Sequence, residues 1–135
     1  MTDRYVSLRD GFVRALARLD ALLAEPDSEI VRDALIQRFE FTVEVAWKAM
    51  QAWAAAQGFD PRSPAETLRL APALGLLADD DEVATWLAMI ADRNRTSHVY
   101  REDVAEAVAA RVREQHAATL RRLGPRLPLA GPETP

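Results

Sequence analysis

The sequence predicts an all-α protein, an up-and-down four-helix bundle with one additional short helix, which dimerises. Four long segments carry apolar residues at intervals of three and four, the period of an amphipathic helix. No segment has the alternating pattern of a strand, and the sequence contains no internal repeat. With 135 residues, the chain can bury one core but not two independent ones. We therefore expect a single helical domain over residues 1–123.

The first helix is predicted from an apolar stripe and from the proline that follows it. It ends near Pro26, because a proline disfavours the helical conformation of the residue before it. Asp27 or Ser28 then suits the start of a second helix, which is expected from about residue 27 to 57. The stripe of the first helix consists of Tyr5, Leu8, Phe12, Leu16, Leu19 and Leu23.

The second helix is apolar around most of its circumference. A helix of this kind is covered on more than one side. In a domain of this size, a second copy of the chain can supply the additional cover, so we expect a homodimer with this helix at or near the interface. Its one narrow polar stripe consists of Asp33, Gln37, Glu40, Glu44, Lys48 and Gln51.

Capping signals predict the third and fourth helices. Ser63, Pro64 and Glu66 have the spacing of a helix start, and Gly75 is expected to end this short helix. The acidic run 79–82 then suits the start of the fourth helix, and we interpret it as capping rather than as a metal site. The chain has no cysteine, which excludes disulfides and thiolate metal sites. We expect no metal and no cofactor.

The fifth helix is predicted from residue 102 to 123. His116 lies far along it and is expected to matter little to function. Residues 124–135 are rich in proline and glycine and are expected to form a flexible tail. The inward positions of the helix are Val104, Val108, Val112, Thr119 and Leu123.

Composition and charge favour a cytoplasmic protein that does not enter a membrane. No run of about 18 uncharged apolar residues is present, and the N-terminus lacks the basic-then-apolar layout of a signal peptide. The net charge of −4 argues against a protein that coats nucleic acid nonspecifically. A local basic cleft remains compatible with this charge.

The candidate functional segment is residues 92–100, at the end of the fourth helix. The apolar face of that helix continues into Arg93 and Asn94, at the next positions of its inward stripe. Burying such groups without partners costs roughly 1–3 kcal/mol for a neutral group and more for a charged one. We therefore expect these side chains to line a cleft or an interface.

Arg93 and His98 together suit chemistry on a phosphodiester. Five residues on an unbroken helix place two side chains about 140° apart, so they converge only if the helix ends near Thr96 and Ser97. An arginine would then hold the phosphate oxygens while the imidazole moves a proton. On RNA this reaction needs no metal, since the 2′-hydroxyl is the nucleophile. From spacing alone the alternative stays open that Arg93 pairs with Glu40 or Glu44 and that His98 caps a carbonyl.

The motif of an arginine, four residues, a histidine, one residue and a tyrosine, at Arg93–Tyr100, resembles the signature of HEPN domains. The second helix, through residues 33–42 and 45–48, resembles the branch named nucleotidyltransferase substrate-binding proteins. Ser63–Pro64, Leu68–Ala71 and Trp86–Met89 follow in the same order, so the resemblance covers roughly residues 5 to 120.

The resemblance implies a dimeric helical bundle in which the segments from Arg93 to His98 of two chains face one cleft. It assigns Arg93 to phosphate binding, Asn94 to a helping polar role, His98 to acid–base catalysis and Tyr100 to modification. Toxin members of the family cleave RNA without metal, and a separately encoded minimal nucleotidyltransferase acts as antitoxin by adding AMP to the tyrosine. Arg101 departs from the family, in which an aspartate or asparagine often caps the last helix.

Two functions therefore remain open. The chain is a metal-independent endoribonuclease toxin that a nucleotidyltransferase silences by AMPylation, or it is a noncatalytic subunit that binds the nucleotidyltransferase or presents its substrate. Glu40 and Glu44 are expected to support the site from the second helix. The partners implied are a nucleotidyltransferase encoded nearby, a second copy of the chain and, for the toxin, RNA. A bundle that binds an unrelated ligand is a third possibility.

Overall fold

The computed structural model describes residues 3–98 and 101–129, with Ser97 and His98 described through their backbone alone. The described part of the chain contains helices and turns and no strand, so the predicted all-α fold is confirmed. The helices are α1 (Asp3–Leu23), α2 (Glu29–Ala56), α3 (Pro64–Leu70), α4 (Asp80–His98), α5 (Glu102–Arg111) and α6 (Ala117–Leu123). Short 3₁₀ turns follow α3 (Ala71–Leu74) and α6 (Gly124–Arg126), and a π-helical turn (Val112–His116) joins α5 to α6.

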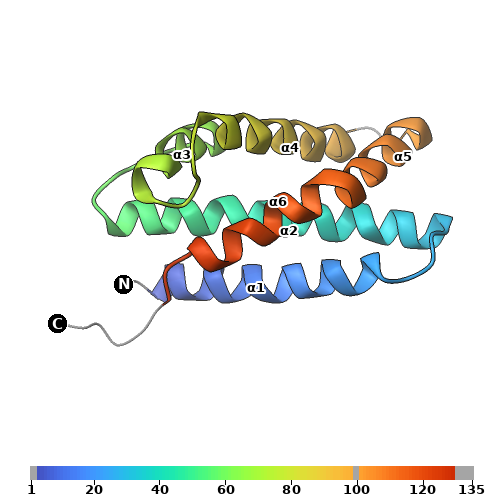
Figure 1. Cartoon of the computed structure of the whole chain (residues 1–135), viewed down its shortest axis with the longest axis horizontal. Coiled ribbons are helices and arrows are strands. Elements are labelled where there is room, and N and C mark those ends of the chain that lie inside the picture. The colour runs from blue at the N-terminus through green and yellow to red at the C-terminus, as the bar shows by residue number, and fades with distance from the viewer. Residues whose placement is uncertain (1–2, 99–100, 130–135) are drawn as a thin grey trace.

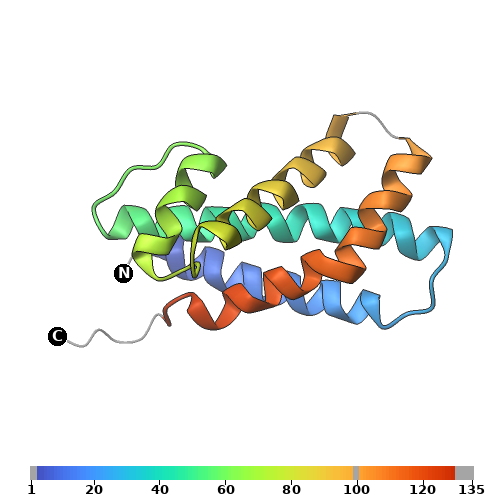
Figure 2. The same cartoon turned by 45° about the horizontal axis from the view of Figure 1, so that its top comes forward.

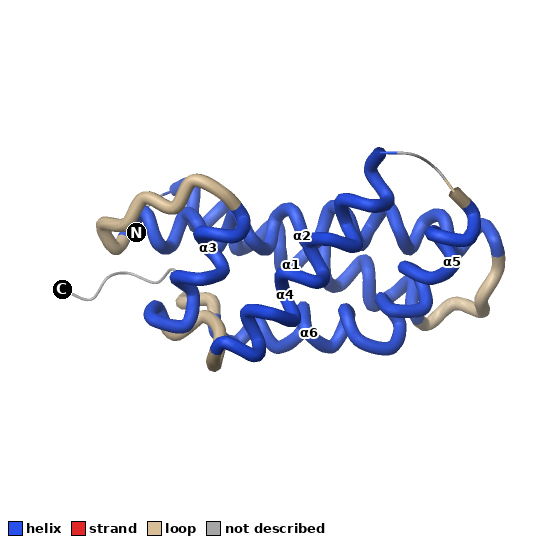
Figure 3. Tube along the Cα trace, turned by 90° about the horizontal axis from the view of Figure 1, so that it is seen from above, coloured by secondary structure: helices blue, strands red, loops and turns tan. Residues whose placement is uncertain are grey.

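The predicted bundle of four longer helices with a short one between the second and the fourth is also confirmed. Helices α1 and α2 lie antiparallel and in contact along their length (Figure 1). Helix α4 and the continuous rod of α5, the π-helical turn and α6 pack across them (Figure 2). The connection between α2 and α3 lies at one end of the molecule, and the start of α5 lies at the other (Figure 3).

The predicted caps determine where three helices begin. The Ser28 hydroxyl accepts a hydrogen bond of 3.1 Å from the amide of Val31 at the start of α2. Ser63 accepts one of 3.1 Å from Glu66 at the start of α3. At the start of α4, Asp79 accepts one of 2.9 Å from the Glu82 amide, so the acidic run does contain a helix cap. The left-handed conformations of Gly58 and Gly75, with φ of 95° and 76°, end the segments before them.

The core lies where α1, α2, α4 and the α5–α6 rod meet. Two apolar side chains of α2 remain outside it, since Ile30 is 81% exposed and Phe41 is 60% exposed. Helix α2 therefore keeps apolar surface that one chain does not cover, and the homodimer stays a prediction. No described helix is both long and apolar enough to cross a membrane. The largest fully buried side chains include Trp86, Tyr5, Phe12, Phe39, Leu35, Met50, Met89 and Leu120.

The tail predicted to begin at residue 124 instead begins with a segment that packs on the bundle. Residues 124–126 form a 3₁₀ turn, and Leu127 is only 2% exposed. The Tyr5 hydroxyl donates a hydrogen bond of 2.6 Å to the carbonyl of Pro128, and Arg126 donates one of 2.6 Å to Glu82. Residues 124–128 therefore differ from the expected flexible tail, because prolines that bar a long helix do not prevent docking. Residues 130–135 lie outside the described part of the chain.

Candidate functional site

Helix α4 continues without a break through the candidate segment to His98. The helix break near Thr96 and Ser97, which convergence of Arg93 and His98 within one chain would require, is therefore absent. The Thr96 hydroxyl donates a hydrogen bond of 2.8 Å to the Arg93 carbonyl within the helix, and it also lies against the Glu40 carboxylate of α2. Because helical geometry satisfies this hydroxyl, Thr96 has no reason to break the helix.

The unbroken helix separates the two catalytic candidates within one chain. Positions 93 and 98 are five residues apart, which places them about 140° apart around the helix axis. Asn94 is exposed on α4 beside Arg93. The side chain of His98 and the whole of Tyr100 lie outside what the structure describes, so their predicted roles stay predictions. Within the unbroken helix, positions 93 and 98 therefore do not lie on one face.

Arg93 is held by Glu44 of α2. The guanidinium Nη2 lies 3.1 Å from Glu44 Oε1, and 29% of the Arg93 side chain is exposed. Of the two pairings left open by the sequence, that with Glu44 is the one present. The same carboxylate lies 3.0 Å from Lys48 and accepts a hydrogen bond of 3.3 Å from the Trp47 indole.

The surroundings of Glu44 keep it ionised. Burial by itself would raise its pKa, but hydrogen bonds from Lys48 and Trp47 and the charges of Arg93 and Lys48 together lower it below the usual value. One turn earlier on α2, a Glu40 carboxylate oxygen shares the Thr96 hydroxyl hydrogen with the Arg93 carbonyl. The stripe of α2 therefore brings Glu40 and Glu44 against the last turns of α4, on the side that carries Arg93.

Asp92 forms a buried charge cluster that the sequence analysis missed. Its side chain is 3% exposed and accepts hydrogen bonds of 2.7 Å from Nε and from Nη2 of Arg111, together with one from Arg95. Burial by itself would raise the pKa of Asp92, but the hydrogen bonds and charges of Arg111 and His116 lower it to about 2. The spacing of the sequence could have indicated that Asp92 is buried. It follows Trp86 and Met89 at intervals of three residues on the buried face of α4.

His116 belongs to this cluster and so has structural contacts that the sequence did not indicate, while the expectation that it matters little to function stays a prediction. The His116 side chain is 3% exposed, and its Nε2 atom lies 2.7 Å from Asp92 Oδ2. The imidazole ring stacks on the Phe39 ring, with the two ring centroids 5.3 Å apart. The π-helical turn ends at His116. The position of His116 four residues after the buried Val112 is compatible with the helical period, whereas its contact with Asp92 depends on tertiary packing.

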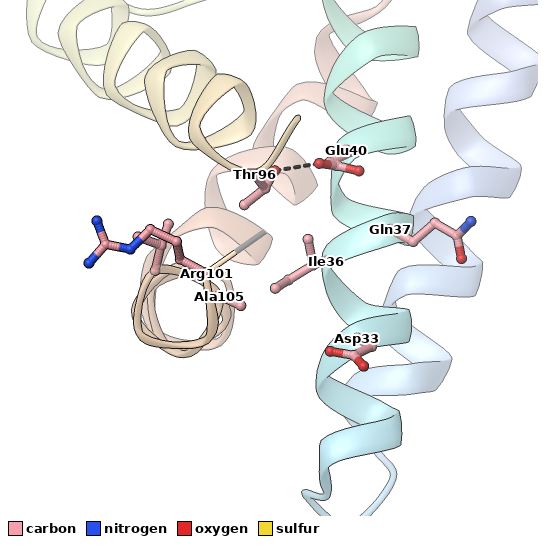
Figure 4. Close-up of a pocket in the computed structure, with 8 residues that line it drawn as sticks. Asp33, Ile36, Gln37, Glu40, Thr96, Arg101 and Ala105 are labelled. Carbon is pink, nitrogen blue, oxygen red and sulfur yellow. Dashed lines mark hydrogen bonds between the residues drawn. The ribbon is translucent and has the colours of Figure 1, made fainter. Parts of the chain in front are cut away.

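A pocket of about 360 Å³ adjoins the segment, between α2, the end of α4 and the start of α5 (Figure 4). Asp33, Ile36 and Glu40 line it from α2, Thr96 from α4 and Val104 from α5. Among the side chains that the structure describes, no group of three or more histidines and carboxylates could hold a metal ion.

The comparisons with known proteins place the chain in a family. Residues 9–128 match the family model described as nucleotidyltransferase substrate binding protein like. A solved structure from Thermus thermophilus has 39% sequence identity and a TM-score of 0.77, over 87% of this chain and 99% of that one. No curated protein matches the sequence significantly.

Structures of lower identity share the fold. A tri-AMPylated HEPN toxin of Shewanella oneidensis, solved in complex with its MNT antitoxin, has 15% identity and a TM-score of 0.74, over 93% of this chain and 96% of that one. A toxin–antitoxin structure with AMP-PNP has 14% identity and a TM-score of 0.70, over 93% and 96% of the two chains. The chain is thus a member of the nucleotidyltransferase substrate-binding family and has the helical fold of HEPN proteins.

Proposed function

We propose that the chain is the HEPN partner of a minimal nucleotidyltransferase in a toxin–antitoxin pair, and that it acts as a metal-independent endoribonuclease. The observation that carries the proposal is the position of Arg93. Glu44 orients its guanidinium at 3.1 Å while 29% of the side chain remains open to solvent. A guanidinium has five donors in a fixed fork, so a carboxylate can hold one edge while other donors meet a phosphate.

The reaction uses groups of the RNA and of the motif. Arg93 binds the nonbridging oxygens of the scissile phosphate, and Asn94 assists at the exposed edge. The 2′-hydroxyl attacks phosphorus while His98 accepts its proton, and the bond to the 5′-oxygen breaks. His98 then returns the proton to that oxygen, which leaves a 2′,3′-cyclic phosphate and a 5′-hydroxyl. The bonds and protons of this reaction balance without a metal or a cofactor.

Since α4 separates positions 93 and 98, the site is completed across a dimer. Arg93 of one chain and the histidine at position 98 of a second copy act on one phosphate. Glu40 and Glu44 support the site by holding Thr96 and Arg93. The second candidate, a noncatalytic subunit of the nucleotidyltransferase, is favoured by the same ion pair, because Arg93 already has a carboxylate partner within its own chain.

An RNA cleavage assay with motif variants distinguishes the two functions. Arg93→Ala and His98→Ala should each reduce cleavage at least about 100-fold, the lower range for loss of a transition-state charge contact and of acid–base catalysis respectively, while EDTA should leave it unchanged. Arg62→Ala is the matched control, since Arg62 is 79% exposed, pairs with Asp60 and belongs to the connection at the other end of the molecule. Cleavage that chelation abolishes, or that all variants share equally, would disprove the mechanism. A wild-type dimer without cleavage would favour the noncatalytic subunit.

A further inference from the structure

The pocket beside Thr96 has an apolar centre with a carboxylate at each end. Asp33, Ile36 and Glu40 follow one face of α2, and the two carboxylates are about 10 Å apart along the helix axis, given a rise of 1.5 Å per residue. Ile36 points into the space between α2 and α5, which Ala105 faces from the other side (Figure 4). Two other polar groups lie at the rim of the pocket and point away from the pocket: the Gln37 amide and the Arg101 guanidinium.

The two carboxylates have acceptor capacity to offer a ligand. Within the described part of the chain, Asp33 makes no hydrogen bond or ion pair, and Glu40 uses only Oε2, towards Thr96. A carboxylate accepts hydrogen bonds and donates none when ionised. The pocket therefore suits a flat, partly apolar molecule that carries N–H donors at one end and hydroxyl groups at the other.

From this arrangement we infer that the pocket is a ribonucleotide subsite that takes one nucleotide of the RNA, an inference that rests on the proposed function. Ile36, Val104 and Ala105 cover the faces of the base, Asp33 accepts from its edge, and Glu40 Oε1 accepts from a ribose hydroxyl. The volume of about 360 Å³ lies within the range of roughly 300–1,000 Å³ for small-molecule sites. Thr96 joins the pocket to the motif, because it binds Glu40 and the Arg93 carbonyl.

An acceptor such as Asp33 determines which bases the pocket prefers. Guanine presents two adjacent donors, N1–H and the N2 amino group, which a carboxylate accepts together. Adenine and cytosine each present one amino group, and carboxylates are known to accept from the cytosine amino group. Uracil presents a single N–H between two carbonyl oxygens, which the carboxylate repels. We expect guanine to bind best and uracil worst.

Binding of mononucleotides tests the pocket without any cleavage. The methyl groups of Ile36, Val104 and Ala105 should shift in NMR spectra on titration with GMP and least with UMP. Asp33→Ala should weaken GMP binding at least about fivefold, the low end for a bidentate base contact. Glu25→Ala, which removes an exposed carboxylate before α2, should not change it. Absent methyl shifts, or equal affinity for all four nucleotides, would overturn the subsite.

The positions at which RNA is cleaved show whether the nucleotide in the pocket belongs to the RNA substrate or is a free nucleotide. Wild-type chain should cleave next to guanosine in preference to uridine, and Asp33→Ala should reduce that preference while cleavage continues. Cleavage without base preference, together with methyl groups that do not shift on titration, overturns the subsite but agrees with the proposed ribonuclease activity. Guanine-selective methyl shifts in a chain that cleaves no RNA uphold the pocket as a site for free nucleotides and reject the ribonuclease.

Discussion

At the scale of single residues, the Asp92 carboxylate links the candidate segment to the rest of the core. Asp92 is buried and directly precedes Arg93 in the sequence. Its carboxylate contacts Arg95 of α4, together with Arg111 and His116 of the α5–α6 rod. A buried carboxylate with such partners is costly to disturb, since removal of one member leaves the others unpaired in a low-dielectric environment. Asp92 therefore positions the helix that carries Arg93.

The pKa of Asp92 predicts how stability depends on pH. Its folded value of about 2 lies below the ordinary 3.8, so the ionised form stabilises the fold above about pH 4, and this contribution is lost as the pH falls towards 2. The shift corresponds to about 2 kcal/mol. Asp92→Asn should lower the free energy of unfolding at pH 7 by about 2–4 kcal/mol and reduce its loss between pH 4 and 2. Urea unfolding measures both.

Asp103→Asn is the control for that experiment, because Asp103 is 69% exposed and pairs with the exposed Arg101. It should change the free energy of unfolding by less than about 1 kcal/mol. An Asp92→Asn chain as stable as wild type at pH 7, with the same acid transition, would show that the cluster contributes no net stability.

Tyr5 is inaccessible to a modifying enzyme. Tyr5 is fully buried, donates its hydroxyl to Pro128 and has a pKa raised to about 12 by burial, against a smaller opposing effect of Arg9. If the proposed function holds, co-expression with a minimal nucleotidyltransferase partner should therefore add AMP to Tyr100 and not to Tyr5. Each addition raises the mass of the chain by about 329 Da, the mass of AMP less that of water.

Intact-mass and peptide spectra check this prediction. Tyr100→Phe should abolish the added mass, whereas Tyr5→Phe should retain it. An unmodified wild-type chain after co-expression with an active partner, or AMP found on Tyr5, would exclude Tyr100 as the point of control.

At the scale of elements, the segment after α6 contributes to the bundle. Leu127 is 2% exposed, and Arg126 donates a hydrogen bond to Glu82. The Glu82 side chain also accepts a hydrogen bond from the backbone amide of Ala78, just before α4. A chain that ends at Leu123 loses the burial of Leu127 and the Tyr5–Pro128 hydrogen bond. It should lose about 2–4 kcal/mol of unfolding free energy, the sum expected for one leucine and one buried hydrogen bond.

A chain that ends at Leu129 serves as the matched truncation, because it keeps the docked segment and removes residues 130–135. Its melting temperature should equal that of the full chain, and the shorter chain should melt several degrees lower. Equal melting temperatures for both truncations would mean that the contacts of Leu127 and Pro128 do not stabilise the fold.

Helix α2 is the element that connects fold and site. One face lies in the core through Leu35, Phe39 and Val43, while Glu40 and Glu44 meet α4. Because these two carboxylates are one turn apart, the axial position of α4 on α2 determines which of them Arg93 reaches. That position depends on side-chain packing between the helices rather than on the sequence of either one.

At the scale of the whole molecule, the proposed site depends on a second chain. Within one chain, positions 93 and 98 point about 140° apart, and α2 exposes Ile30 and Phe41. Sedimentation should give a mass twice that of the 15.0 kDa chain at micromolar concentration. A monomer under these conditions would remove the shared site from the mechanism.

Mixing two inactive variants tests the shared site directly. Arg93→Ala and His98→Ala chains, combined in equal amounts, should recover about a quarter of wild-type cleavage, since half of the dimers are mixed and each mixed dimer has one intact site of two. If both residues acted within one chain, mixing would restore nothing. Each variant by itself provides the baseline.

The sequence by itself determined the helices, their caps and the family. Ser28, Ser63 and Gly75 act through hydrogen bonds and backbone angles within a few residues, so local reasoning reaches them. The motif at Arg93–Tyr100 was likewise readable, because its spacing is a property of the chain.

Only the tertiary structure decided which partners these residues have. The choice of Glu44 for Arg93, the bond between Asp92 and His116, 24 residues apart, and the docking of Leu127 all depend on how helices meet. Each joins groups distant in the sequence. Periodicity describes one helix, whereas these contacts arise from the packing of several, where burial makes an unpaired charge costly and so selects its partner.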